Sequence, residues 1–129
     1  MSTPVVKPVI TVYGIPNCNT VKNARVWLDL HGIAYTFHDF KKAGVNAALV
    51  TSWLPHLGLD VLINRKGTTW RALDDAQKAA AEDTQQAIAL MMAQPSVIKR
   101  PVLTIDGSAH VGFSDAAYEQ IFQTSKTAP

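Results

Sequence analysis

Cys18 is the one cysteine of this 129-residue chain, and its neighbours suit thiol chemistry. Asn17, Asn19 and Thr20 flank it with short hydrogen-bonding side chains, and Lys22 is the nearest cation in sequence. The segment lies between a predicted strand and the first turn of a predicted helix, where unpaired N–H groups and the helix dipole favour a thiolate. A small, buried and unreactive side chain is the alternative, and position alone does not decide between the two.

The chain offers no second thiol to Cys18. A C-x-x-C motif would need cysteine at position 21, where the residue is Val21. One cysteine excludes an internal disulfide and leaves no cysteine pair for a zinc cluster. The histidines have no metal-ligand spacing, so no metal site is predicted; they are His31, His38, His56 and His110. If Cys18 reacts, its resolving thiol must come from solution.

Two arginines are candidates for binding an anion near this thiol. Arg65 lies in a loop between helical segments, and Arg100 stands directly before Pro101 and a predicted strand. Arginine stays charged, and its planar fork of donors suits carboxylates and oxyanions. A solvated surface side chain is the alternative for each.

The elements that would position these residues begin with a strand, a helix and a strand. Residues 9–13 are largely β-branched and are bounded by Gly14, which predicts a buried strand. A helix follows Cys18, and Gly32 is the expected left-handed residue that stops it. Alternating apolar residues over 33–38 predict a second strand, which a short crossover makes parallel to the first.

The remainder predicts a helical block and then a hairpin with a final helix. Asn46 is expected to cap a helix that ends at Pro55, and further helices are predicted at 75–82 and, capped by Asp83, at 83–94. Strands at 102–105 and 110–113 surround an Asp-Gly turn at 106–107, and Ser114 can cap the last helix. The order βαβ, helical insert, ββα predicts an α/β protein with a thioredoxin-like fold. One domain is expected over 1–129, with a core at about 9–123, an insert at about 46–95 and frayed ends.

Composition excludes several classes of partner. The chain is 47% hydrophobic and 17% charged with a formal net charge of +2, which is typical of a globular protein. Its charges are scattered and form no basic stripe, so nucleic-acid binding is not expected. The longest apolar run, residues 87–93, is far shorter than the roughly 20 residues that span a bilayer. Residues 1–8 lack the apolar segment of a signal peptide, so a cytoplasmic protein without a membrane partner is expected.

Four segments in a fixed order resemble the arsenate reductase (ArsC)/Spx family, most closely its YffB-type branch. They are Tyr13–Ala24, Leu62–Arg71, Ile98–Leu103 and Gly112–Asp115. The resemblance spans about residues 10–123 and implies the thioredoxin-like fold with a helical insert.

The resemblance also implies roles for individual residues. Cys18 matches the family's nucleophile. Arg65 and Arg100 match two arginines that lower the thiol pKa and bind the oxyanion in arsenate reductases. Pro101 matches a proline that is cis and faces the cysteine. The residues around Cys18, namely Asn17, Asn19, Thr20 and Lys22, are added as candidate substrate- or glutathione-binding residues.

The chain departs from the family pattern in two places. Residues 18–22 replace a C-G-T-S-R-like loop, and Phe113 stands where classical members have a third arginine. Both changes remove an anion-binding group and weaken the expectation of arsenate as substrate.

The resemblance implies a glutathione-dependent thiol reductase with no bound cofactor. Glutathione would be the co-substrate, together with a small oxidised substrate. One alternative is an arsenate reductase coupled to glutathione and glutaredoxin. The other is an Spx-like regulatory binding protein without catalytic activity, with RNA polymerase as a candidate partner.

Overall fold

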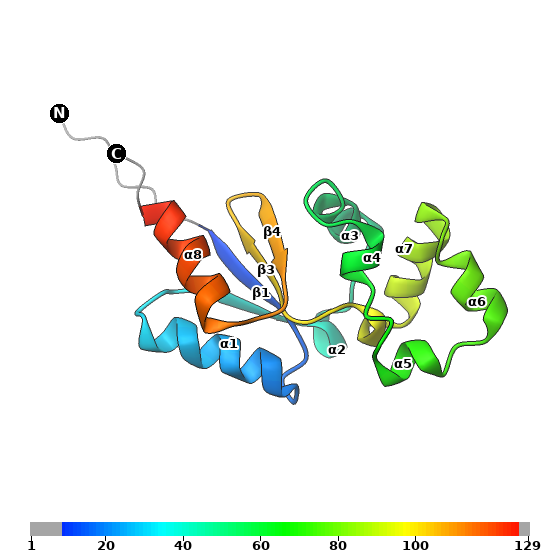
Figure 1. The fold of residues 1–129 in the computed structure, drawn as a ribbon, viewed down its shortest axis with the longest axis horizontal. Coiled ribbons are helices and arrows are strands. Elements are labelled where there is room, and N and C mark those ends of the chain that lie inside the picture. The colour runs from blue at the N-terminus through cyan, green and yellow to red at the C-terminus, as the bar shows by residue number, and fades with distance from the viewer. Residues whose placement is uncertain (1–8, 127–129) are drawn as a thin grey trace.

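Strand β1 (Ile10–Gly14) is central to a four-stranded mixed sheet. It pairs in parallel with β2 (Thr36–Asp39) and antiparallel with β3 (Val102–Ile105), and β4 (Ser108–Val111) lies beyond β3. Helix α1 (Asn19–Leu30) connects β1 to β2, and α8 (Asp115–Lys126) follows β4 (Figure 1). This computed structural model describes residues 9–126, with side chains through residue 122. The predicted α/β class and thioredoxin-like order of elements are confirmed.

A glycine lies near each end of helix α1, and each has a structural role. Gly14, at the end of β1, permits the first turn to lie close to the strand, because a Cβ there would come within 2.7 Å of Val21. At the other end Gly32 adopts φ +66°, and its N–H donates to the Asp29 carbonyl at 3.1 Å. The N–H of Ile33 donates to the Leu28 carbonyl at 3.0 Å, which completes a Schellman motif. The predicted glycine stop is therefore confirmed.

The two faces of the sheet pack against different layers. Inward residues of β1 and β3 meet α1 and α8 in one buried cluster: Ile10, Val12, Ala24, Trp27, Leu28, Leu103, Ile105, Tyr118 and Phe122. Alternation along the strands turns Tyr13, Val102 and Ala109 to the opposite side, where they join a second cluster built mainly from the insert. Figure 1 shows the insert beside the sheet, away from α1 and α8.

The insert consists of short helices around a core that includes Trp53, Leu62 and Met91. Its elements are α2 (Phe40–Ala43), α3 (Ala47–Trp53), α4 (Leu59–Leu62), α5 (Thr68–Arg71), α6 (Asp75–Ala80), α7 (Thr84–Ala93) and the 3₁₀ turn η1 (Pro95–Val97). The predicted caps are present: Asn46 accepts from the Leu49 N–H and Asp83 from the Gln86 N–H, at 2.8 and 3.0 Å. None of the helices within the described part of the chain is long and apolar enough to cross a membrane.

The structure corrects several predicted boundaries. Strand β2 begins at Thr36 rather than residue 33, because the Schellman turn at the end of α1 still occupies the chain. Strand β4 spans 108–111 rather than 110–113. Asp106 and Gly107 both have positive φ and form a tight two-residue turn. Ile105 therefore pairs directly with Ser108, and the strand begins immediately after the turn. The short elements α2, α4, α5 and η1 were not predicted, since three or four residues show no usable periodicity.

The buried Tyr118 hydroxyl has no hydrogen-bond partner among the described residues. We expect Tyr118→Phe to raise the free energy of unfolding by about 1 kcal/mol, because an unsatisfied buried hydroxyl is removed while the ring packing stays. Tyr35→Phe is the matched control: its hydroxyl accepts from Arg25 Nε at 3.0 Å, and its removal should be neutral or destabilising. Urea unfolding monitored by circular dichroism measures both. A clear loss of stability in Tyr118→Phe would contradict an unpartnered hydroxyl.

Candidate active site

Cys18 is the N-cap residue of α1, at the end of the loop that follows β1. Its N–H donates to the Ile15 carbonyl at 3.2 Å, and its carbonyl accepts from the Lys22 N–H at 2.9 Å. The side chain is partly buried. The loop therefore holds the sulfur at the positive end of a twelve-residue helix, as the sequence predicted.

Opposing effects set the ionisation of this thiol. Burial by itself raises the pKa of Cys18, because it penalises the charged form. The Val21 N–H, the Arg100 guanidinium and the Thr20 N–H stabilise the thiolate, and Arg100 also adds its positive charge. The stabilising groups prevail, so the pKa of Cys18 lies below its ordinary value. The thiolate, which is the nucleophilic form, is thereby favoured.

Arg100 reaches the thiol because a short antiparallel bridge holds its segment in place. Ile63 pairs with Ile98, the Asn64 N–H donates to the Val97 carbonyl, and the Lys99 N–H donates to the Leu62 carbonyl, both at 2.7 Å. Nη1 of Arg100 donates to the Ser96 carbonyl at 2.8 Å. The Ser96 carbonyl thus anchors the guanidinium to the insert, and the same guanidinium stabilises the thiolate of Cys18, which follows β1 of the sheet.

The peptide bond between Arg100 and Pro101 is cis, as the resemblance implied. Pro101 is buried directly before β3, and its carbonyl accepts the Gly112 N–H at 2.9 Å. Gly112 has φ +78°, a conformation that favours glycine. The cis bond and the turn at Gly112 therefore lie side by side at the end of the hairpin.

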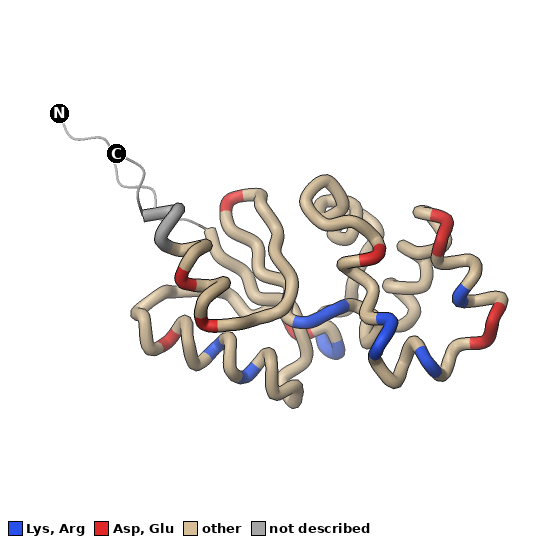
Figure 2. The backbone as a smooth tube through the Cα atoms, in the orientation of Figure 1, with Lys and Arg blue, Asp and Glu red and all other residues tan. Residues whose placement is uncertain are grey.

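Cys18 opens into a pocket of about 530 Å³. Its walls come from the start of α1, the two bridged loops, the end of β4 and the start of α8; the residues are Cys18, Thr20, Asn64, Lys99, Arg100, Val111, Gly112, Phe113, Ser114 and Ala117. Lys99 and Arg100, which are adjacent in the chain, give one part of the wall a positive charge. Phe113 forms part of the wall and packs edge-on against Tyr118, with ring centroids 4.7 Å apart. In Figure 2 the basic segment before β3 lies between the sheet and the insert.

The structure gathers some of the predicted site residues and separates others. Cys18, Thr20 and Arg100 line the pocket, and Pro101 adjoins it. The neighbours of Cys18 that were also predicted, Asn17, Asn19 and Lys22, are exposed and do not line it.

Arg65, expected beside the thiol, is not brought into this pocket. Its guanidinium lies 3.7 Å from the Glu82 carboxylate and 5.4 Å from the Trp70 ring centroid. These contacts hold Arg65 on the insert. Its predicted role as an anion ligand for Cys18 has no support in this arrangement.

Three polar pocket residues were not among the predicted site residues: Asn64, Lys99 and Ser114. Lys99 could have been found, since it adjoins Arg100 and doubles the local charge. Asn64 and Ser114 come from distant loops, and Ser114 was interpreted only as a helix cap. It does cap α8, accepting from the Ala117 N–H at 3.1 Å. The site therefore combines a thiol of lowered pKa, a positively charged side and an aromatic wall.

The chain is similar to known proteins in both sequence and fold. Residues 13–121 match the model of the ArsC family. An uncharacterised protein of Haemophilus influenzae is 41% identical over 113 residues, which is 88% of this chain and 98% of the relative. The global transcriptional regulator Spx 2 of Lactococcus lactis is 24% identical over 109 residues, covering 82% of this chain and 80% of the relative.

Two solved structures share both fold and sequence. The YffB protein is 48% identical, with a TM-score of 0.82 over 87% of this chain and 97% of its own. An arsenate reductase (ArsC) related protein from Brucella melitensis is 45% identical, with a TM-score of 0.71 over 94% and 98% of the two chains. A family model that covers most of the chain, together with relatives above 40% identity, leads to one conclusion: this chain belongs to the ArsC family.

Proposed function

We propose that this arsenate reductase-like protein is a glutathione-dependent thiol reductase with Cys18 as its single nucleophile. The observation that carries the proposal is the Cys18 thiol, held at a helix N-terminus beside Arg100 in a chain with one cysteine. The site favours a thiolate, and the second thiol must be supplied by another molecule.

The reaction runs in two exchanges. The Cys18 thiolate attacks one sulfur of a disulfide that contains glutathione; the S–S bond breaks, and the other sulfur leaves as a thiolate and takes a proton. Cys18 is then joined to glutathione. The thiolate of a second glutathione attacks that glutathionyl sulfur, releases oxidised glutathione and regenerates the Cys18 thiolate. Lys99 and Arg100 supply the positive charge that a glutathione carboxylate would pair with.

Arsenate is a second candidate substrate, because the same pocket combines a nucleophilic sulfur with two cations. Phe113 argues against it, since an aromatic wall offers no donor to a small oxyanion that carries several charged oxygens. An Spx-like regulatory role without catalysis would not require the lowered pKa of Cys18 or the hydrogen bond between Arg100 and the Cys18 sulfur.

The first prediction concerns ionisation. The rate of Cys18 alkylation by iodoacetamide should fall, as pH decreases, through a midpoint below that of an ordinary cysteine, because the folded site stabilises the thiolate. Arg100→Ala should move this midpoint upward. Arg65→Ala is the matched control and should leave it unchanged, since Arg65 is held by Glu82 and Trp70.

A midpoint at the ordinary cysteine value, or equal shifts in the two arginine variants, would contradict the assigned electrostatics. A native thiol that resists alkylation at every pH would show that Cys18 is an inert buried side chain.

The second prediction concerns turnover with glutathione as reductant. The wild-type protein should reduce the mixed disulfide of glutathione and N-acetylcysteine amide, and Cys18→Ser should abolish the reaction. Arg100→Ala should lower kcat/KM about 10- to 100-fold, because a charge-assisted hydrogen bond contributes about 1.5–3 kcal/mol. Arg65→Ala should retain the wild-type value. Release of oxidised glutathione, followed with glutathione reductase and NADPH, gives the rates.

Arsenate is assayed beside the disulfide with the same variants. We expect arsenate turnover to be weak in the wild type and to increase in Phe113→Arg, which restores a donor to the pocket wall. Turnover of arsenate but not of the disulfide by the wild type would assign the second candidate substrate. Turnover of neither, with a stable protein partner that survives Cys18→Ser, would favour the regulatory alternative.

A further inference from the structure

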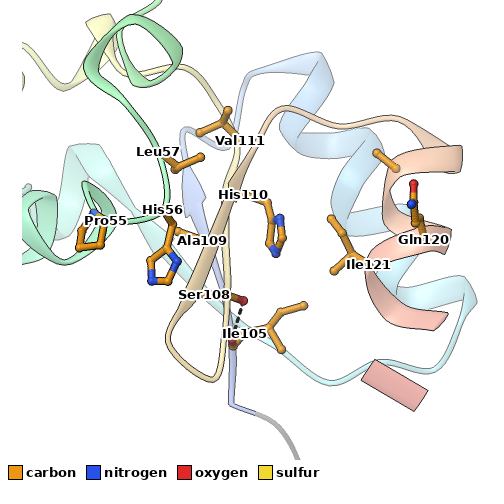
Figure 3. A pocket seen from close by; sticks show the side chains of 11 residues that line it. Pro55, His56, Leu57, Ile105, Ser108, Ala109, His110, Val111, Gln120 and Ile121 are labelled. Carbon is orange, nitrogen blue, oxygen red and sulfur yellow. Dashed lines mark hydrogen bonds between the residues drawn. The ribbon is translucent and has the colours of Figure 1, made fainter. Parts of the chain in front are cut away.

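A second pocket, of about 960 Å³, runs along β4 and shares only Val111 and Ala117 with the lining of the thiol pocket (Figure 3). All four residues of β4 line it. One shoulder is the loop that follows α3, including His56 and Leu57, and the other is α8, including Ile121. In Figure 3 His110 points toward α8, whereas His56 and Leu57 come from the opposite side. The pocket is therefore a groove with a strand as its floor.

Strand β4 is an edge strand, since β3 is its one neighbour in the sheet of the described residues. The Gly112 N–H donates to the Pro101 carbonyl, which sets the alternation along the hairpin. Gly112, His110 and Ser108 then direct their backbone groups toward β3. Ala109 and Val111 direct theirs toward the free edge. The floor of the groove thus carries backbone donors and acceptors that β3 does not use, at Ala109, which is 5% exposed, and at Val111, which is partly exposed.

This four-residue edge lacks the charged side chains and prolines that often prevent strand addition. The sequence of β4, Ser-Ala-His-Val, contains no Lys, Asp, Glu or Pro. No Asp, Glu, Lys or Arg lines the groove. Burial, and then the neighbouring His56, lower the pKa of His110, so His110 is neutral at pH 7. A charged small ligand would find no counter-charge here, whereas an uncharged extended polypeptide matches both floor and shoulders.

The groove adjoins the thiol pocket through shared lining residues. Val111 and Ala117 line both of them, and Val111 is the last residue of β4. A strand paired with β4 covers about four residues, roughly 14 Å at about 3.4 Å per residue. Because Val111 also lines the pocket that holds Cys18, the next residue of such a strand would lie at that pocket.

We propose that the free edge of β4 binds an extended segment of a protein substrate and delivers an adjoining oxidised cysteine to Cys18. This inference rests on the proposed thiol-reductase function and names its substrate as a glutathionylated polypeptide. The Cys18 thiolate attacks the glutathione sulfur, the S–S bond to the polypeptide breaks, and the polypeptide cysteine leaves as a thiolate that takes a proton. A free glutathione thiolate then releases oxidised glutathione from Cys18, so one free glutathione thiol is oxidised for each protein cysteine that is reduced.

The test compares glutathione mixed disulfides of increasing length with the wild-type protein. The short substrate is N-acetylcysteine amide. The long substrates are peptides with four β-branched or apolar residues before the cysteine in one series and after it in the other. We expect at least one series to have a kcat/KM at least tenfold above that of the short substrate. N-methylation of alternate peptide amides, in the register that pairs with Ala109 and Val111, should return it to the short-substrate value.

A protein variant tests the same contact from the other side. Ala109→Pro removes a donor that faces the free edge and no hydrogen bond to β3. It should lower kcat/KM for the long substrates alone and leave the short substrate unchanged, with folding checked by circular dichroism. The N-methylated peptides need no variant, so they decide the matter if Ala109→Pro fails to fold. Equal kcat/KM for short and long substrates, or indifference to N-methylation in both registers, would overturn the proposal.

Binding without turnover separates this inference from the proposed function. A fluorescent peptide with serine in place of cysteine should bind Cys18→Ser, and its N-methylated form should bind at least tenfold more weakly. That result supports the groove even if no mixed disulfide is reduced, in which case the thiol-reductase function alone has failed. Absence of binding overturns the groove. A concentration-dependent dimer in sedimentation velocity that Ala109→Pro dissolves would also overturn it, because a second copy would then occupy the edge.

Discussion

The antiparallel bridge between Ile63 and Ile98 is the contact on which the candidate site depends. The segment that begins at Val97 belongs first to the insert, where Val97 and Ile98 are fully buried, and then to the sheet, where Leu103 packs against α1 and α8. Lys99, Arg100 and Pro101 lie between these two anchored ends. Because both ends are held, the guanidinium of Arg100 stays beside a cysteine that lies eighty-two positions earlier in the chain.

The thiol itself is a balance between burial and polar stabilisation. A partly buried sulfur near Phe113 would by desolvation alone be a poor nucleophile. The first-turn N–H groups of α1 and the charge of Arg100 reverse that effect, and they do so from two different elements. Gly14 contributes indirectly, since its missing side chain lets Val21 and the first turn of α1 approach β1. The lowered pKa of Cys18 thus depends on backbone N–H groups as well as on a charged side chain.

The two pockets differ in charge and in the ligands that we propose for them. The thiol pocket carries the cations and suits an anionic partner such as a glutathione carboxylate. The groove along β4 carries none of the charged residue types and suits a polypeptide backbone. They share the lining residues Val111 and Ala117, and on this basis we propose that one substrate occupies both. The β3–β4 hairpin contributes to both pockets. The cis residue Pro101 directly precedes β3 beside the thiol pocket, and β4 has the free edge that forms the floor of the groove.

The sequence by itself determined those features that local chemistry controls. The caps at Asn46, Asp83 and Ser114, the glycine stop at Gly32 and the position of Cys18 at a helix start depend on residues a few positions apart, so they could be predicted. Only the tertiary structure decided which distant residues meet. It places Lys99 and Asn64 in the thiol pocket and leaves Arg65 with Glu82 and Trp70, because packing of the insert and the bridge at Ile63, rather than residue type, sets where each side chain lies. The groove along β4 exists only because β4 is at the edge of the sheet, between α8 and the loop after α3.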